Sequence, residues 1–210
     1  MNKFGLLICL LLLVSSVAAQ SEQYANNQEE FKTIFSNKRS NGGYGALSIA
    51  YSEIDNKDAI IVGARGGWII NHSLAIGLGG YGFANDINYD NLFNDNRDYN
   101  LAGGYGGLFV EPIIGPKLPV HISIPILFGF GGVSYVEHHN NWDYWWSTDD
   151  KSDVYFVFEP AIELEFNVTR HFRLAATASY RFTSDIEMLY TDPDILEGLT
   201  AGLVFKFGKF

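Results

Sequence analysis

The chain has 210 residues and a formal net charge of −10, with 18% charged residues, 15% aromatic residues and 22 glycines. Charged surface is scarce for a soluble domain of this size, whereas small residues suit the crowded interior of a barrel. The acidic balance argues against a nucleic-acid partner, because nucleic-acid binding depends on Lys and Arg side chains that neutralise phosphates.

The N-terminus has the pattern of a secretory signal. Lys3 precedes an apolar run, and the small residues up to Ala19 form a cleavage site, so residues 1–19 are predicted to be a signal peptide cleaved near Ala19. The run is shorter than the roughly 20 residues of a membrane-spanning helix. Removal of the signal takes away Cys9, the single cysteine, and changes the net charge from −10 to −11 because Lys3 is lost. We therefore expect no disulfide and no thiol chemistry.

Residues 20–41 are polar and are predicted to be an N-terminal segment separate from the domain at residues 42–210. In that domain, apolar residues alternate with small or polar ones, the period of two that is typical of β-strands. The alternating segments are about 43–53, 59–70, 74–83, 99–112, 120–135, 154–166, 172–183 and 198–210.

Connection lengths alternate along the chain. Short turns at Asn71, Gly115 and Asn167 alternate with long polar connections, including residues 137–152 and 184–197. This asymmetry predicts an all-β fold, an eight-stranded antiparallel up-and-down transmembrane β-barrel with short periplasmic turns and longer extracellular loops. Pro112, Pro125 and Pro160 fall inside the expected strands, and we predict a bulge at Pro160 because a central strand tolerates proline poorly.

The last segment, GLTAGLVFKFGKF, places Leu199, Leu203 and Phe207 on one face. It resembles the closing strand of bacterial outer-membrane barrels, and the chain from about Gly42 to Phe210 resembles the small porin-like, OmpA-type or OmpX-type eight-stranded barrels. The resemblance implies an outer-membrane location, with residues 20–41 as a periplasmic N-terminal segment and residues 42–210 as the outer-membrane β-barrel domain. It implies a surrounding of outer-membrane lipid and lipopolysaccharide. It also implies recognition of the C-terminal strand by the barrel assembly machinery. We expect a monomer.

Charged residues within the strands share the parity opposite to the apolar face. An Arg facing lipid at the bilayer midplane costs about 2 to 4 kcal/mol, so these residues are expected to face the lumen. A hairpin centred on Thr169 places Glu165 opposite Arg173 and leaves Glu159 diagonal to Arg181. The predicted lumen charge network is Arg65, Glu111, Glu159, Glu163, Glu165, Arg173 and Arg181. An eight-stranded barrel is just wide enough for such side chains, so we expect a plugged interior.

Two motifs bear on chemistry. His121 and Ser123 form an H-x-S pattern that resembles the pattern of lipid A deacylase barrels, but its position at the periplasmic rim argues against an enzyme that acts on the outer leaflet. His138 and His139 near Asp143 point to opposite sides of an extended chain, which disfavours a metal site. We predict no catalytic residue, no cofactor and no metal.

An aromatic cluster, Trp142, Tyr144, Trp145 and Trp146, lies in the connection after the fifth segment. It fits either an aromatic belt at the membrane interface or a contact patch on an exposed loop. Its distance from Phe130 and its interleaving with Asn and Asp favour at least two rings above the bilayer, in contact with a partner or surface glycan. The sequence therefore predicts a non-enzymatic integral outer-membrane barrel, structural or surface-interacting. The alternatives are a narrow transporter of small hydrophobic solutes and a lipid-modifying enzyme.

Overall fold

The computed structural model describes residues 41–54, 57–85, 89–90, 98–137, 152–188 and 191–210. The predicted signal peptide and nearly all of the N-terminal segment therefore lie outside the described residues. Within the described residues, no helix is both long and apolar enough to span a membrane. The strands are β1 (Asn41–Ile54), β2 (Lys57–Ile70), β3 (Leu74–Asn85), β4 (Tyr89–Asp90), β5 (Asp98–Ile114), β6 (Val120–Ser123), β7 (Ile126–Glu137), β8 (Ser152–Asn167), β9 (Phe172–Thr183) and β10 (Gly198–Lys209).

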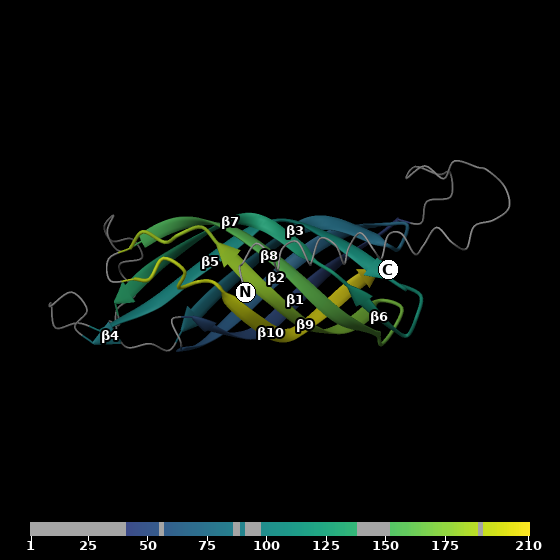
Figure 1. Ribbon diagram of the computed structural model, residues 1–210. Helices are drawn as coiled ribbons and strands as arrows, with labels where there is room; N and C mark the ends of the chain where they lie inside the picture. Colours follow the sequence, from purple (N-terminus) through teal and green to yellow (C-terminus); the bar gives the residue numbers. More distant parts are fainter. Residues whose placement is uncertain (1–40, 55–56, 86–88, 91–97, 138–151, 189–190) are drawn as a thin grey trace, which may run out of the picture. The chain divides into compact units, whose positions relative to one another are not determined.

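The described strands form one closed antiparallel barrel (Figure 1). Neighbours in sequence pair with one another, β10 pairs with β1, and β3 pairs with β5. Strands β6 and β7 make one barrel strand interrupted at Ile124 and Pro125, because both pair with β5 in a single register. The short β4 only extends the hairpin with β5. Eight barrel strands remain, which confirms the fold class predicted from the sequence.

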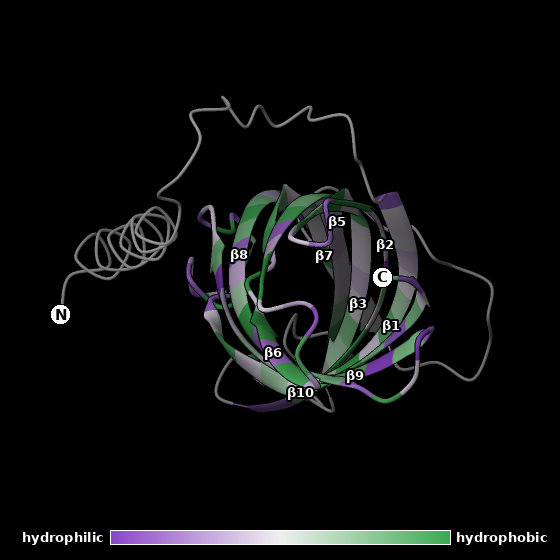
Figure 2. Cartoon of the chain, turned by 90° about the vertical axis from the view of Figure 1, so that its right-hand side faces the viewer, coloured by the Kyte–Doolittle hydropathy of each residue, from purple (hydrophilic) through white to green (hydrophobic). Residues whose placement is uncertain are grey.

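Alternate side chains divide between the lumen and the outer wall, and Figure 2 shows strands closing around the interior. Side chains of one parity are exposed on the wall and are largely apolar, as a surface in contact with lipid acyl chains requires. They include Leu47, Ile49, Ile60, Val62, Trp68, Leu78, Leu108, Phe130, Val154, Phe156, Ile162, Leu199 and Phe207. The strand alternation in the sequence therefore corresponds to the two faces of the wall.

Aromatic rings of the lumen lie over glycines of other strands. A Cβ atom on Gly67 would lie 2.9 Å from the Phe109 ring and 3.2 Å from the Tyr44 ring. The ring of Tyr155 covers Gly131 in the same way. These glycines are needed because any larger residue would overlap a ring that the narrow lumen leaves no room to move.

Pro160 does not produce the bulge expected from the sequence. A bulge requires an extra residue in one strand, whereas β8 and β9 keep one register, with Phe158 opposite Phe182 and Ala161 opposite Ser179. The ladder between β8 and β9 is instead interrupted at Glu159 and Pro160. The reason is that proline has no N–H to donate to β9, while the following N–H, that of Ala161, donates to Pro125 O at 2.8 Å on the other side.

The connection between β9 and β10 folds back into the barrel. We call residues 184–188 and 191–197 the strap. Ile186, Met188, Ile195 and Leu196 of the strap are buried, and Asp153 Oδ2 accepts a hydrogen bond from the Glu187 amide at 2.6 Å. The sequence indicates only a long polar connection here, so burial of these apolar side chains is a feature that the structure adds.

Candidate functional site

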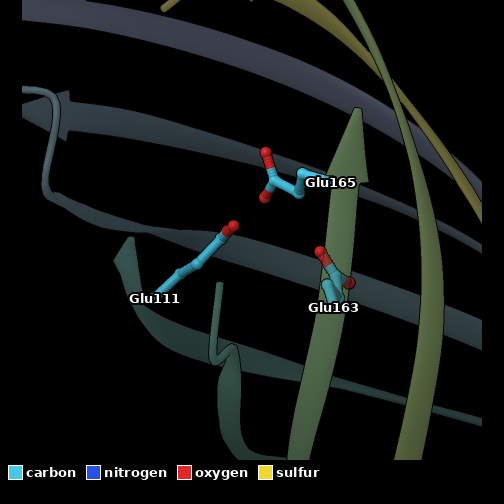
Figure 3. Close-up of side chains that lie close together, drawn as sticks. All are labelled: Glu111, Glu163 and Glu165. Atoms are coloured by element: carbon cyan, nitrogen blue, oxygen red, sulfur yellow. The ribbon is translucent and has the colours of Figure 1, made fainter. Parts of the chain in front are cut away.

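A layer of buried charges crosses the lumen near the short turns. At its centre is Lys206 of β10, whose Nζ lies 2.5 Å from Glu111 Oε1 and 2.8 Å from Glu163 Oε2. Lys206 also forms an ion pair with Glu165. Figure 3 shows the three carboxylates directed toward a common point. A single ammonium therefore joins β10 to β5 and β8 across the interior.

Two arginines complete this layer, which we call the charge hub: Arg65, Glu111, Glu163, Glu165, Arg173 and Lys206. Arg65 Nη2 lies 2.6 Å from Glu163 Oε2 and 3.8 Å from Glu111 Oε2. Arg173 Nη1 lies 3.1 Å from Glu165 Oε2. Three formal positive charges thus face three carboxylates, which is the condition under which charges are retained in a protein interior.

Neutral side chains and rings surround the hub. Tyr44 donates its hydroxyl hydrogen bond to Glu111, and Ser123 donates to Glu165 Oε1 at 2.6 Å. The guanidinium of Arg173 lies over the ring of Phe210, 3.9 Å from its centroid, within the range of a cation–π contact. The C-terminal aromatic residue therefore contacts the hub directly.

The structure divides the predicted lumen network into two groups. Arg65, Glu111, Glu163, Glu165 and Arg173 meet in the hub. The remaining two, Glu159 and Arg181, lie further toward the long connections.

The diagonal contact expected between Glu159 and Arg181 is replaced by other partners. Glu159 Oε1 accepts a hydrogen bond from Ser179 Oγ at 2.6 Å. Arg181 Nε donates to Leu196 O at 2.7 Å, and its Nη1 donates to Tyr105 Oη at 3.4 Å. The acceptor for Arg181 is thus a backbone carbonyl of the strap, a segment that the sequence did not place in the lumen.

The hairpin register also differs from the one predicted. Glu165 lies opposite Ala175, and Arg173 lies opposite Asn167, because the turn is centred on Arg170 and not on Thr169. The Thr169 amide donates to Phe172 O at 3.0 Å, which closes the turn. Glu165 still reaches Arg173, but diagonally.

Lys206 is the main residue absent from the predicted network. Lys206 lies on the same face of β10 as Thr200 and Val204, which are both buried, whereas the next residue, Phe207, lies on the exposed face. The argument that turned Arg173 inward therefore applies equally to Lys206. Tyr44 was missed for a different reason, since a tyrosine carries no charge to mark it as a member of an ionic layer.

The H-x-S pattern does not form a nucleophile with its base. His121 Nε2 lies 3.0 Å from Glu165 Oε2, and the Ser123 hydroxyl donates to carboxylates, at 2.6 Å to Glu165 and 3.3 Å to Glu163. Activation of a serine requires a hydrogen bond from its hydroxyl to the histidine. Among the described contacts, Ser123 makes no such bond to His121. The pair is instead part of the polar surround of the hub.

The three hub carboxylates also have the spacing of a cation site. Oxygens of Glu111, Glu163 and Glu165 lie within 4.8 Å of one another, and carboxylate oxygens are ligands for divalent cations. The ammonium of Lys206 lies among these oxygens. The chain therefore supplies its own cation at this point.

The predicted contact patch, Trp142, Tyr144, Trp145 and Trp146, lies outside the described residues, as do His138, His139 and Asp143.

No protein-family model and no curated protein matches the chain. Among solved structures, the chain is similar to Neisserial surface protein A, with a TM-score of 0.54 and 14% identity over 82% of this chain and 99% of that one. It is also similar to Ail of Yersinia pestis, solved with the heparin analogue sucrose octasulfate, with a TM-score of 0.50 and 11% identity over 80% of this chain and 97% of that one. At these identities the likeness concerns the fold. The chain has the fold of the small eight-stranded outer-membrane β-barrels.

Proposed function

We propose that the protein is a non-enzymatic integral outer-membrane barrel that acts as a structural or surface-interacting component, with a lumen plugged by paired charges. The observation that carries the proposal is the ion pairing of Lys206 with Glu111, Glu163 and Glu165 across the interior. All four side chains are at most 1% exposed. A solute path through this layer would require breaking buried ion pairs, at several kcal/mol for each uncompensated charge.

Without a path through the lumen, function falls to the outer wall and the connections beyond the strand ends. The wall exposes apolar side chains suited to lipid, and pairing of β1 with β10 leaves no open edge. These features support a monomer surrounded by outer-membrane lipid and lipopolysaccharide. They also support β10 as the strand that the barrel assembly machinery recognises.

The chemistry of the surface favours a neutral or basic partner. The strap exposes Asp185, Glu187, Asp192 and Asp194, and the chain carries a net charge of −10. A polysulfated sugar of the kind seen with Ail would be repelled by this charge. We therefore propose an uncharged glycan or a basic protein surface as the partner, contacted by Trp142, Tyr144, Trp145 and Trp146.

Conductance in planar bilayers tests the plugged lumen. The folded barrel is expected to insert without producing a steady, large channel. Matched recordings on a Lys206→Ala variant, which opens the centre of the hub, provide the comparison. A steady open channel in the unmodified protein would contradict the proposal and favour a transporter.

A further inference from the structure

The end of the barrel that carries the short turns has basic side chains and no acidic ones. We call this end the short-turn rim, and it comprises residues 41–43, 70–74, 112–120, 166–172 and 207–210. These residues include Lys117, Arg170 and Lys209 and contain no aspartate or glutamate. All three basic residues are exposed. The charged side chains of the short-turn rim are therefore positive and accessible.

Hydrogen bonds between neighbouring turns bring the three cations onto one arc of the rim. Asn167 Nδ2 donates to Leu118 O at 2.6 Å, which ties the turn before β6 to the turn after β8. The Gly208 amide donates to His171 O at 2.9 Å, which ties the turn after β8 to the end of β10. Strands β6, β8, β9 and β10 are consecutive in the wall, and neighbouring strands lie about 4.8 Å apart, so the arc spans roughly 14 Å.

Each of these cations has an exposed apolar side chain within two residues of it in the sequence. Leu118 follows Lys117 and is 58% exposed, while Val168 and Phe207, in the other two segments, are 55% and 54% exposed. Long basic side chains lay their methylene groups along apolar surface and keep the charged group in water. The rim therefore has the composition that suits the depth at which acyl chains give way to phosphates.

The opposite rim has the opposite charge. Besides Lys57, it exposes a set of carboxylates: Glu53, Asp58, Asp185, Glu187, Asp192 and Asp194. Figure 1 shows the C-terminus and β6 at one end of the barrel and β4 at the other. An anionic lipid is thus attracted to the short-turn rim and repelled at the other rim. This polarity favours a phospholipid of the leaflet that meets the short turns over the lipopolysaccharide of the opposite leaflet.

We propose that the short-turn rim is a binding surface for the headgroups of anionic phospholipids in the periplasmic leaflet, with Lys117 and Arg170 at its centre. The proposal rests on the outer-membrane barrel proposed above and names the lipid at one of its rims. Each Lys or Arg near an anionic membrane surface strengthens the attraction about five-fold. Exposed cations on separate turns bind by charge, so the preference should weaken as salt screens it.

Electron paramagnetic resonance of spin-labelled lipids tests the headgroup preference. Spin-labelled phosphatidylglycerol and phosphatidylcholine are compared in phosphatidylcholine vesicles that contain the full barrel, and the motionally restricted fractions give the relative association constant. We expect phosphatidylglycerol to be favoured about five-fold at low ionic strength and much less at 1 M salt, where the Debye length is about 3 Å. Equal association of the two lipids with the unmodified protein would overturn the proposal.

Variants at the two rims locate the preference. The Lys117→Gln, Arg170→Gln double variant is expected to lose most of the preference for phosphatidylglycerol. Lys57→Gln changes the net charge as much as Lys117→Gln does, but at the acidic rim, and should retain the preference. An unchanged preference in the double variant would place the anionic lipid elsewhere and overturn the proposal. If the double variant does not fold, the single Lys117→Gln variant, compared with Lys57→Gln, decides the matter.

Failure of this proposal differs from failure of the proposed function. A barrel that inserts, shows heat-modifiable migration on gels and has no headgroup preference would contradict lipid binding alone, and would favour an acidic protein as the ligand of the short-turn rim. A chain that inserts into no vesicle would contradict the membrane barrel and the lipid site together.

Discussion

Lys206 and Glu111 belong to strands on opposite sides of the barrel, yet Lys206 Nζ and Glu111 Oε1 are 2.5 Å apart. Their contact spans the full width of the lumen. Because the same ammonium also meets Glu163 and Glu165, one side chain connects three strands.

Replacing Lys206 by Met is expected to destabilise the barrel strongly. The variant leaves three buried carboxylates facing two guanidinium groups, and removal of one partner from a buried ion pair typically costs about 3 to 5 kcal/mol. Urea unfolding followed by tryptophan fluorescence in detergent or lipid measures the loss. Lys209→Met is the matched control, because Lys209 is exposed at the end of the same strand, and a change below about 0.5 kcal/mol is expected there. Equal stability of the two variants would refute the central role of Lys206.

Gly67→Val is expected to hinder folding because its side chain would overlap the ring of Phe109. A Cβ atom at this position already lies 2.9 Å from that ring, and overpacking of a filled interior costs about 1 to 3 kcal/mol. Heat-modifiable migration on gels reports the folded fraction. Gly45→Val serves as the control, since no atom lies within 4 Å of a Cβ built there. A partial recovery of folding in the Gly67→Val, Phe109→Leu double variant would identify the ring as the cause.

Leu196→Ala is expected to loosen the strap and leave the barrel assembled. Leu196 is 0% exposed, and truncation of a buried leucine costs about 2 to 5 kcal/mol. Because Leu196 lies outside the strands, the substitution is expected to destabilise the packing of the strap before it destabilises the barrel. Limited proteolysis should cut residues 184–197 faster in this variant. The Asp194→Asn variant, changed at an exposed position of the same segment, should be cut at the wild-type rate. Loss of heat-modifiable migration in Leu196→Ala would show instead that the strap is part of the folding core.

Changing both Trp145 and Trp146 to Ala is expected to reduce surface binding and to preserve assembly. Exposed aromatic rings contribute contact area at an interface without stabilising the barrel itself. Binding to a glycan array and heat-modifiable migration are to be measured on the same preparation. Failure of the double variant to assemble would identify the rings as membrane anchors and remove the contact patch from the proposal.

Strand existence and the direction of side chains follow from the sequence because both depend on a local period of two. The same period places Arg65, Glu111 and Arg173 in the lumen, where the structure has them paired. Pairing partners are harder to predict. The register of β8 with β9 depends on a turn that shifts by one residue, from Thr169 to Arg170, and this moves the opposing residue by two.

The strap could not be predicted, because its burial depends on a tertiary position that its composition does not reveal. Exposed Asp and Glu alternate there with Ile186 and Met188, and such an alternation looks the same in a solvated loop as in a segment folded into a barrel mouth. The contact predicted between Arg181 and Glu159 fails for the same reason. Arg181 donates instead to the carbonyl of Leu196, which belongs to the strap.

The position of Lys206 on β10 also helps to select the register in which β10 pairs with β1. Backbone hydrogen bonds between β1 and β10 are nearly the same in any even-numbered register, so they discriminate poorly between correct and slipped barrels. A slip of two residues would carry the Lys206 ammonium about 7 Å along the wall, away from its carboxylates. The slipped barrel would then bury unpaired charges, at several kcal/mol each. The ion pair between Lys206 and Glu111, across the lumen, therefore favours the register in which Leu47 lies opposite Phe205.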